Sequence, residues 1–260
     1  MSASNCQIEL RGIGLDFRLY KNKSFSLREW LLNSIAFHQP GAELFTALDK
    51  VSLSIVKGER VALIGPNGAG KSSLLKVIAG IYPPSRGEMT IRGRITPLIE
   101  MGAGFHHELT GRENLFLNGA ILGASRRNII ERTHRILEFS EIDPQFLDTP
   151  IKYYSTGMRT RLAFGIAMEL DPEIVILDEI FSNADAHFVQ KACARLEGSA
   201  SAHQILLLVS HDLELIRRLA RRCIWIKGGG IAQDGPVDSV VPAYEAAMLQ
   251  NGSGDESKNA

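Results

Sequence analysis

Short runs of uninterrupted apolar residues recur along the chain and predict buried strands. They span residues 61–64, 174–177, 205–209 and 224–226, and contain only valine, isoleucine, leucine, alanine and tryptophan. Strands that helices cover on both faces have this unalternated composition. Helical patterns separate the runs, so the sequence predicts an α/β fold built on a mainly parallel sheet.

Two stretches near the N-terminus alternate loosely between apolar and polar residues, as half-buried strands do. They span residues 7–20 and 45–56, and a turn at 57–59 leads from the second stretch into the apolar run that follows. These stretches predict a small second sheet. Residues 88–95, after a Pro-Pro-Ser turn, predict a further short strand.

Between the first two strands, residues 24–37 predict an amphipathic helix that projects from the small sheet. Leu27, Trp30, Leu31 and Ile35 recur at the spacing of one helical face. Such a stripe fits two situations. Either the helix packs on its own domain, or it meets a membrane-spanning partner or the headgroup boundary of a membrane.

Residues 101–165 carry helical patterns and little strand pattern, which indicates an inserted helical subdomain. Thr110 precedes one apolar stretch and Glu113 stands three residues later, the spacing of a capping box. The helix that they start is expected to run to about residue 119. Residues 126–138 predict a second amphipathic helix.

The composition is that of a globular protein with one substantial core. The chain has 260 residues, of which 45% are hydrophobic and 22% charged, and its 29 basic and 29 acidic side chains cancel. We expect residues 1–250 to form a single domain and the polar residues 251–260 to be a disordered tail. Without a basic field, nucleic acid is not an expected partner.

Cysteine usage and hydropathy bear on the compartment. Cys6, Cys193 and Cys223 are far apart and form no Cys-x-x-Cys pair, which favours a reducing cytosol over a disulfide framework or a zinc site. Residues 1–12 lack the apolar core of a signal peptide, and no run approaches the roughly 20 apolar residues that span a bilayer. For work at a membrane, we expect another chain to cross it.

A glycine-rich stretch between the run at 61–64 and a helical pattern predicts a phosphate-binding loop. Its glycines allow backbone N–H groups to turn onto phosphate oxygens, and the helix N-terminus adds partial positive charge. Lys71 is expected to reach the β- and γ-phosphates, Ser72 to ligate Mg²⁺, and Ser73 to make a second phosphate contact. The predicted nucleotide-binding residues of this loop are Gly65, Pro66, Asn67, Gly68, Ala69, Gly70, Lys71, Ser72 and Ser73.

Two further strands end in groups suited to phosphate hydrolysis. Asp178 and Glu179 follow the run at 174–177, and His211 follows the run at 205–209. We expect Asp178 to hold Mg²⁺ through water and Glu179 to orient the attacking water or accept its proton. His211 is placed to hydrogen-bond the γ-phosphate and to hold Glu179 and the water in line.

With these motifs in this order, residues 7–245 resemble the nucleotide-binding subunits of ABC transporters. The resemblance implies the P-loop core with its mainly parallel sheet, a small antiparallel β-subdomain and an inserted helical subdomain, and it implies ATP and Mg²⁺ as cofactors. Ser155, Gly157 and Met158 stand where the family has its signature Ser-Gly-Gly-Gln loop. In the family this loop caps the nucleotide of the opposite subunit, which implies a homodimer.

Three stretches resemble, more narrowly, exporters of bacterial surface polysaccharide: residues 100–114, 154–164 and 184–188. The methionine in the signature loop and the Asp-Ala-x-Phe that ends at Phe188 are the most specific. The resemblance implies an ATPase that powers export of a lipid-linked glycan, of the O-antigen, capsule or teichoic acid type. It also implies a separate transmembrane permease and a peripheral position on the cytoplasmic face of the inner membrane.

The chain departs from the family pattern at four places. Glu100 stands nearest the place of the usual Q-loop glutamine, and is therefore the candidate for that Mg²⁺ contact. Phe45 is the first choice for the aromatic residue that stacks on adenine, with Tyr20 behind it. Residues 182–185 replace the usual Ser-Ala-Leu-Asp of the D-loop, and no long carboxyl-terminal glycan-binding domain is expected.

Alternatives to this reading remain within and outside transport. Within transport, the chain could serve an exporter of another lipid or of a peptide. Outside it, a soluble ABC ATPase of ribosomes or DNA repair is disfavoured, because such forms carry two nucleotide domains or a long coiled-coil insertion. An inactive structural homologue is disfavoured by the presence of Lys71, Asp178, Glu179 and His211.

Overall fold

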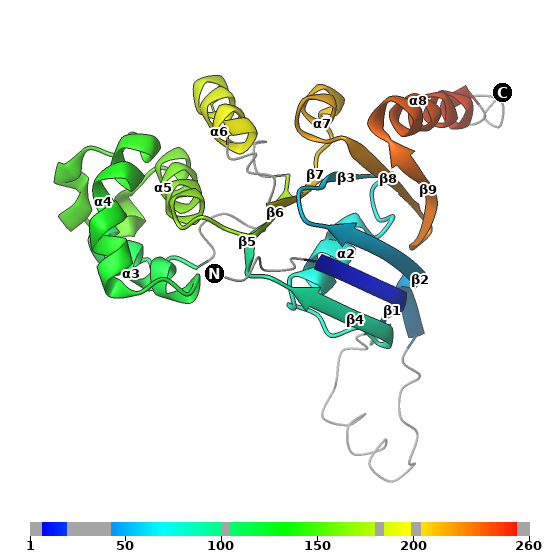
Figure 1. Cartoon of the computed structure of the whole chain (residues 1–260), viewed down its shortest axis with the longest axis horizontal. Helices are drawn as coiled ribbons and strands as arrows, with labels where there is room; N and C mark the ends of the chain where they lie inside the picture. The colour runs from blue at the N-terminus through cyan, green and yellow to red at the C-terminus, as the bar shows by residue number, and fades with distance from the viewer. Residues whose placement is uncertain (1–6, 20–42, 100–103, 180–184, 199–203, 254–260) are drawn as a thin grey trace, which may run out of the picture.

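The computed structural model places the chain in two β-sheets and a set of surrounding helices (Figure 1). It describes residues 7–19, 43–99, 104–179, 185–198 and 204–253. The predicted helix at 24–37, together with Tyr20, Glu100 and residues 182–184, lies outside the described residues.

The larger sheet contains the apolar runs, in the strand order β5-β6-β7-β3-β8-β9. All neighbouring pairs are parallel except β8 with β9, so the prediction of a mainly parallel sheet is confirmed. The strands are β3 (Arg60–Ile64), β5 (Ile95–Ile99), β6 (Ile174–Asp178), β7 (Ile205–Val209), β8 (Arg222–Lys227) and β9 (Gly230–Pro236).

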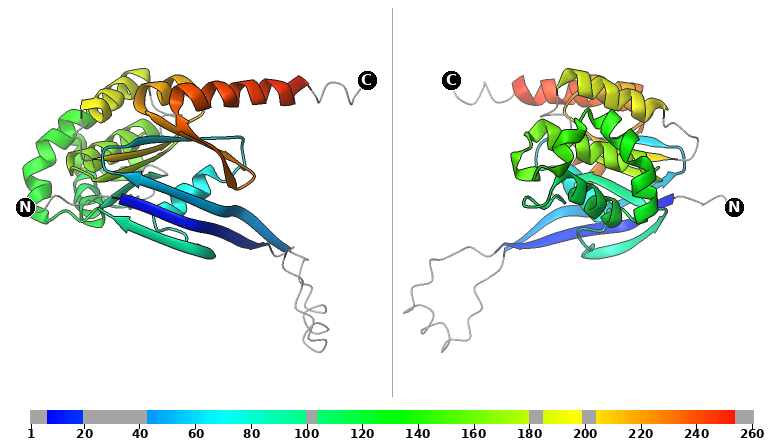
Figure 2. Two further views of the ribbon diagram at one scale, coloured as in Figure 1. Left: turned by 45° about the vertical axis from the view of Figure 1, so that its right-hand side comes forward. Right: turned by 90° about the vertical axis from the view of Figure 1, so that its left-hand side faces the viewer.

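Both faces of this sheet are covered, which explains the absence of polar alternation. On β3, Val61 and Leu63 enter a core cluster shared with the helix α2 (Lys71–Ile78) and the smaller sheet. Ala62 and Ile64 enter a second cluster on the opposite face. Figure 2 shows the helices α6 to α8 on one side of the main sheet and the smaller sheet on the other.

The smaller sheet is antiparallel, with the strand order β2-β1-β4. Its strands are β1 (Gln7–Leu19), β2 (Glu43–Val56) and β4 (Arg86–Arg92). Ile8 and Ile55 are fully buried and join the cluster that contains α2. The small sheet therefore packs on α2 and on the face of the main sheet that α2 covers.

The prediction of one strand over residues 88–95 is wrong, because the chain leaves one sheet and enters the other at this point. Gly93 has φ 121, a conformation that residues with a side chain rarely adopt, and it separates β4 from β5. Pro97 lies in β5. Since β5 is the outermost strand of the main sheet, a missing N–H is tolerated there.

Helices form a separate layer between β5 and β6. Thr110 caps the first of them, and its side chain and that of Glu113 exchange hydrogen bonds with each other's backbone N–H, so the predicted capping box is confirmed. The layer has its own apolar core and lies at one end of the molecule (Figure 1). It contains α3 (Gly111–Ile121), α4 (Arg126–Ser140), α5 (Thr156–Glu169) and the 3-10 helices Pro144–Asp148 and Ile151–Tyr153.

The remaining helices are α6 (Ala186–Gly198), α7 (Leu213–Leu219) and α8 (Val237–Ser253). The helix α8 enters the stretch 251–260 that the sequence analysis assigned to a polar tail. Continuing a formed helix by one turn is easier than starting one, so polar composition alone did not locate its end. Within the described residues, no helix is long and apolar enough to cross a membrane.

Candidate functional site

The main sheet brings three polar segments to one edge. β7 lies between β3 and β6, and Leu63, Val209 and Asp178 lie level with one another across the three strands. The glycine-rich loop follows β3, the acidic pair ends β6, and His211 follows β7. Because the three strands are parallel, all these groups emerge at the same edge of the sheet.

The loop after β3 needs glycine at two positions. Gly65 has φ 147, and a Cβ atom there would lie 2.2 Å from the carbonyl oxygen of Ile226. Gly70 has φ 107, and a Cβ atom there would lie 2.6 Å from the carbonyl oxygen of Ala47. The loop is therefore pressed between β2 and β8, and its backbone geometry is fixed by close approach on both sides.

A second glycine contact supports this loop, and the sequence analysis did not anticipate it. Gly229, in the turn between β8 and β9, donates from its N–H to the carbonyl of Ala69 at 3.1 Å. Its own carbonyl accepts from the N–H of Asp49 at 2.9 Å. The run of three glycines at 228–230 was the available signal, since such a run allows backbone to approach backbone closely.

Lys71 is buried at the start of α2 and is 7% exposed. Its Nζ atom donates to the carbonyl oxygens of Gly65 at 2.8 Å and Pro66 at 3.0 Å. Burial lowers the pKa of Lys71, while the charges of Glu179 and Asp178 act in the opposite direction. The ammonium group of Lys71 therefore lies against the loop, where it could contact a phosphate bound by the loop.

The N-terminus of α2 faces the loop without a side-chain cap. Gly70 occupies the N-cap position and offers no side-chain acceptor to the first N–H groups of the helix. These N–H groups have no partner inside the helix, and the helix dipole adds partial positive charge at this end. Together with Lys71, they form an anion site of the kind that holds phosphate.

Ser72 and Asp178 offer neighbouring oxygen atoms beside this anion site. The Ser72 hydroxyl donates to Oδ1 of Asp178 at 3.3 Å. Burial raises the pKa of Asp178, and the hydrogen bond from Ser72 opposes this only in part. A carboxylate held in a partly dry site next to a hydroxyl is suited to a hard divalent cation, whose charge would offset the cost of burial.

Glu179 and His211 contact each other across the ends of β6 and β7. Nε2 of His211 lies 2.9 Å from Oε1 of Glu179. Glu179 has a left-handed backbone with φ 50, and its N–H donates to the carbonyl of Val209 at 3.0 Å. A cavity of about 510 Å³ adjoins the pair, with walls from α6 and α7.

The turn after His211 is held by a residue that the sequence analysis did not single out. Asp212 caps α7 by accepting from the N–H groups of Glu214 at 2.9 Å and Leu215 at 3.1 Å. The N–H of Asp212 in turn donates to the Ser210 hydroxyl at 3.0 Å. The signal was the Asp that precedes a helical pattern, because such residues prefer the N-cap position.

Ser155, Gly157 and Met158 lie on a different element, at the start of α5. The Ser155 hydroxyl accepts from the N–H of Met158 at 3.1 Å and so caps its own helix. Among the described residues, a Cβ atom on Gly157 would meet only the Ser155 hydroxyl, at 3.9 Å. No described residue therefore covers the start of α5 at Gly157, and this helix belongs to the helical layer rather than to the loop after β3.

Phe45 lies in β2 and is 49% exposed. It is two residues before Ala47, whose carbonyl abuts Gly70. At about 3.3 Å per residue, the backbone of Phe45 lies about 7 Å along β2 from that of Ala47. Its alternative, Tyr20, and the predicted cation ligand, Glu100, lie outside the described residues.

A protein-family model described as ABC transporter matches residues 48–182. The chain is 34% identical over 242 residues to an O-antigen export system ATP-binding protein, RfbB, from Klebsiella pneumoniae, with 93% of this chain and 98% of that protein covered. It is 42% identical over 207 residues to an RfbB from Myxococcus xanthus, and there the match covers 80% of this chain and 47% of the relative.

A solved structure shares the fold at low sequence identity. It is a dimeric structure of a post-hydrolysis state of the ATP-binding cassette MJ0796 bound to ADP and Pi. The TM-score is 0.71 at 21% identity, and the match covers 88% of this chain and 98% of that one. A match over most of both chains at this TM-score confirms the fold class that the sequence predicted.

Proposed function

The chain belongs to the ABC transporter family, and from that premise we propose that it hydrolyses ATP to power export of a bacterial surface polysaccharide. The transported molecule is a lipid-linked glycan of the O-antigen, capsule or teichoic acid type. A separate membrane-spanning permease carries it, and the chain docks on that permease at the cytoplasmic face of the inner membrane. The observation that supports this most is the match along almost the whole length of a relative named for O-antigen export.

The loop after β3 binds the triphosphate. Lys71 exchanges its contacts with Gly65 and Pro66 for the β- and γ-phosphate oxygens, and the uncapped N–H groups of α2 hold the same oxygens. Ser73 is placed in the first turn of that helix for a further contact. Phe45 stacks on the adenine ring from the side of β2.

Ser72 and Asp178 are the residues that fit Mg²⁺. Their oxygens are neighbours already, and Asp178 carries a carboxylate whose pKa burial raises. When bound, the ion neutralises charge on the phosphate oxygens. Glu100 remains a predicted further ligand. The contribution of the chain is to hold the hydroxyl of Ser72 and the carboxylate of Asp178 on two different elements that meet at one point.

Glu179 acts on the attacking water. Its carboxylate orients the water and accepts a proton, while His211 holds that carboxylate by the contact at 2.9 Å. His211 also hydrogen-bonds the γ-phosphate, a role supported by its position directly after β7, the neighbour of the strand that precedes the loop. Water and γ-phosphate are thereby kept in line.

A second copy of the chain completes the site on the side opposite the loop. Ser155 and the backbone of Gly157 lie open at the start of α5, where a helix N-terminus favours an anion. In a homodimer with two such sites, the Ser155 end of each copy contacts the γ-phosphate that the other copy binds. Two nucleotides are then enclosed between two chains.

The experiment that tests this function has two stages. The purified chain is expected to hydrolyse ATP with Mg²⁺ and to stop when the metal is chelated, and Lys71→Ala should lose the activity. In a host strain that lacks the chain, the parent protein should restore the surface glycan and the Lys71→Ala variant should not. If the purified chain hydrolyses ATP but the strain that lacks it has the normal amount of surface glycan, glycan export is contradicted. The exported molecule would then be another lipid or a peptide.

A further inference from the structure

The helix α6 presents a basic stripe to the helical layer. His187, Lys191 and Arg195 are four residues apart, so their side chains lie on one face of the helix. Each of them contacts an acid on the helical layer, and those acids are Glu141 and Glu169. This helix directly follows Asp185, the only described residue of the loop after the acidic pair. The polar face of α6 is thus an interface inside the molecule.

Glu141 follows the last residue of α4 and contacts three basic side chains. Its carboxylate accepts from Lys191 at 2.8 Å and from Arg161 of α5 at 3.4 Å, and Nδ1 of His187 lies 3.6 Å away. Lys191 also donates to the carbonyl of Glu138 at 3.2 Å. The hydrogen bond from Lys191 is the main reason that the pKa of Glu141 is lowered. One carboxylate therefore joins α4, α5 and α6.

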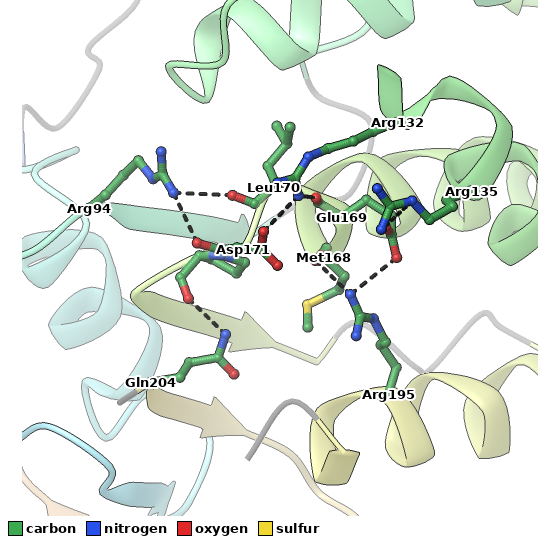
Figure 3. A network of polar contacts seen from close by, with 10 residues as sticks. Arg94, Arg132, Arg135, Met168, Glu169, Leu170, Asp171, Arg195 and Gln204 are labelled. Carbon is green, nitrogen blue, oxygen red and sulfur yellow. Dashed lines mark hydrogen bonds and ion pairs between the residues drawn. The ribbon is translucent and has the colours of Figure 1, made fainter. Parts of the chain in front are cut away.

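Glu169, the last residue of α5, likewise connects α4, α5 and α6 (Figure 3). It is 8% exposed. Its carboxylate accepts from Arg195 at 3.1 Å and lies 4.0 Å from Nε of Arg135 on α4. Its backbone carbonyl accepts from Arg132, which also donates to Asp171 at 2.7 Å. Arginines satisfy the last carbonyls of α5, where the helix dipole favours positive charge.

Aromatic packing fixes the direction of this interface. Phe188 of α6 is fully buried and contacts Phe164 of α5 and Phe139 of α4, with ring centroids 5.7 and 6.0 Å apart. Phe188 thus pairs with the middle of α5, and Arg195, seven residues on, pairs with its last residue, Glu169. The two helices therefore run parallel, and both begin toward the same side.

The N-termini of these two helices carry functional groups. Ser155 begins α5, and the carboxylate of Asp185 accepts from the N–H of Phe188 at 2.8 Å in the first turn of α6. The 14 residues of α5 rise about 21 Å, so a tilt of about 5° at Glu169 would move Ser155 by about 2 Å. Displacements of this size are large for groups that must meet a reacting phosphate.

We propose that Glu169 and Glu141 are positioning residues for the shared nucleotide site. Through Arg195 and Lys191 they hold α5 parallel to α6, and this orientation presents Ser155 to the nucleotide that a second copy binds. The inference rests on the proposed ATP-dependent dimer, since Ser155 acts only across that interface. The buried end at Glu169 contributes more than the half-exposed end at Glu141, because water screens the latter.

The test measures dimer formation in a parent that carries Glu179→Gln, so that bound ATP is retained. Adding Glu169→Gln is expected to raise the dissociation constant of the ATP-bound dimer about tenfold, with ATP affinity of the monomer changed by less than about twofold. Arg195→Gln should act alike, and the double change should be no worse than either single change, because both remove the same contact.

A second variant, at the half-exposed contact between Lys191 and Glu141, keeps the test valid if Glu169→Gln does not fold. Lys191→Met removes the contact to Glu141 at the rim of the interface and should raise the dimer dissociation constant about threefold. The matched control is Arg127→Gln, which breaks an exposed pair with Glu131 inside α4 and should leave the constant unchanged. Sedimentation velocity gives all these constants, and thermal unfolding reports stability separately.

Three results would overturn the inference. Unchanged dimerisation in both Glu169→Gln and Lys191→Met would show that neither contact positions α5. A lower melting temperature, with the dimer constant of the folded fraction unaltered, would reduce the contacts to a structural role. If the Glu179→Gln parent neither binds ATP nor dimerises, the proposed function itself fails, and this inference fails with it. The behaviour of the parent therefore distinguishes the two failures.

Discussion

At the scale of single residues, Lys71 is held against the phosphate-binding loop by two hydrogen bonds. Its ammonium group is satisfied by the carbonyls of Gly65 and Pro66 at 2.8 and 3.0 Å. Lys71→Ala removes the buried cation at the start of α2, so ATP affinity should fall by about tenfold or more. Nucleotide titration of the purified variant measures this, and an affinity within about twofold of the parent would refute the role.

Asp178 gives a second prediction, on stability. A carboxyl whose pKa is raised on folding adds stability at low pH and loses it as the pH rises through the folded pKa, and burial raises the pKa of Asp178. At neutral pH, the ionised side chain therefore costs stability in the nucleotide-free chain. Asp178→Asn should raise the melting temperature near pH 7.5 by about 2 °C and should abolish Mg²⁺-dependent hydrolysis.

The pH dependence of that gain is the check. As the pH falls toward the pKa of Asp178, the parent becomes neutral at this position and the melting temperatures of the two proteins should converge. Thermal unfolding over a pH series measures the difference. An Asp178→Asn variant that melts lower than the parent near neutral pH, with no nucleotide added, would show that the carboxylate stabilises the fold, contrary to the expected cost of burial.

That four of the candidate residues would meet at one edge of the sheet could be predicted from the sequence, because each follows directly on a motif or an apolar strand. Lys71, Asp178, Glu179 and His211 needed only the rule that parallel strands end at one edge. Glu169 could not be found in this way. Its partner Arg195 is 26 residues away on another helix, and no local pattern marks a contact that exists only after packing.

At the scale of elements, the capping box of α3 carries a measurable share of stability. Thr110 accepts from the N–H of Glu113 at 3.2 Å, and Glu113 accepts from the N–H of Thr110 at 2.9 Å. Thr110→Ala should cost about 1 kcal/mol and lower the melting temperature by about 2–4 °C. Ser125→Ala at the start of α4 breaks a one-way cap and should cost less.

Thermal unfolding of both variants decides this, and the order of the two effects is the informative part. Equal or reversed losses would mean that the additional hydrogen bond from the Thr110 hydroxyl to Glu113 adds nothing. ATP hydrolysis should persist in both proteins, because neither cap touches the nucleotide site.

Elements whose signal is local could be predicted, and those that depend on a change of sheet could not. The capping box fixed the start of α3 because its two residues are neighbours in sequence. The expected strand at 88–95 joined two segments that belong to different sheets, since alternation in residues 88–92 says nothing about which partner strand they meet. Gly93, with φ 121, was the one residue that marked the break.

At the scale of the whole molecule, Ser155 separates binding from assembly. It lies on the helical layer and caps α5, away from the loop that holds Lys71. Ser155→Arg should leave ATP affinity of the monomer within about twofold and should block the ATP-bound dimer, because bulk and charge are added where the second copy must approach. If the variant loses ATP affinity and dimer formation equally, Ser155 does not act across the dimer interface.

The dimer is the central claim, and the Glu179→Gln variant tests it most directly. An amide keeps the shape of the carboxylate but cannot accept the proton of the attacking water, so ATP should bind and remain intact. The measurement is the molar mass of this variant in solution, by light scattering after gel filtration, with and without ATP and Mg²⁺. We predict twice the monomer mass with ATP and the monomer mass without it. A variant that binds ATP and stays monomeric at every protein concentration would contradict the account.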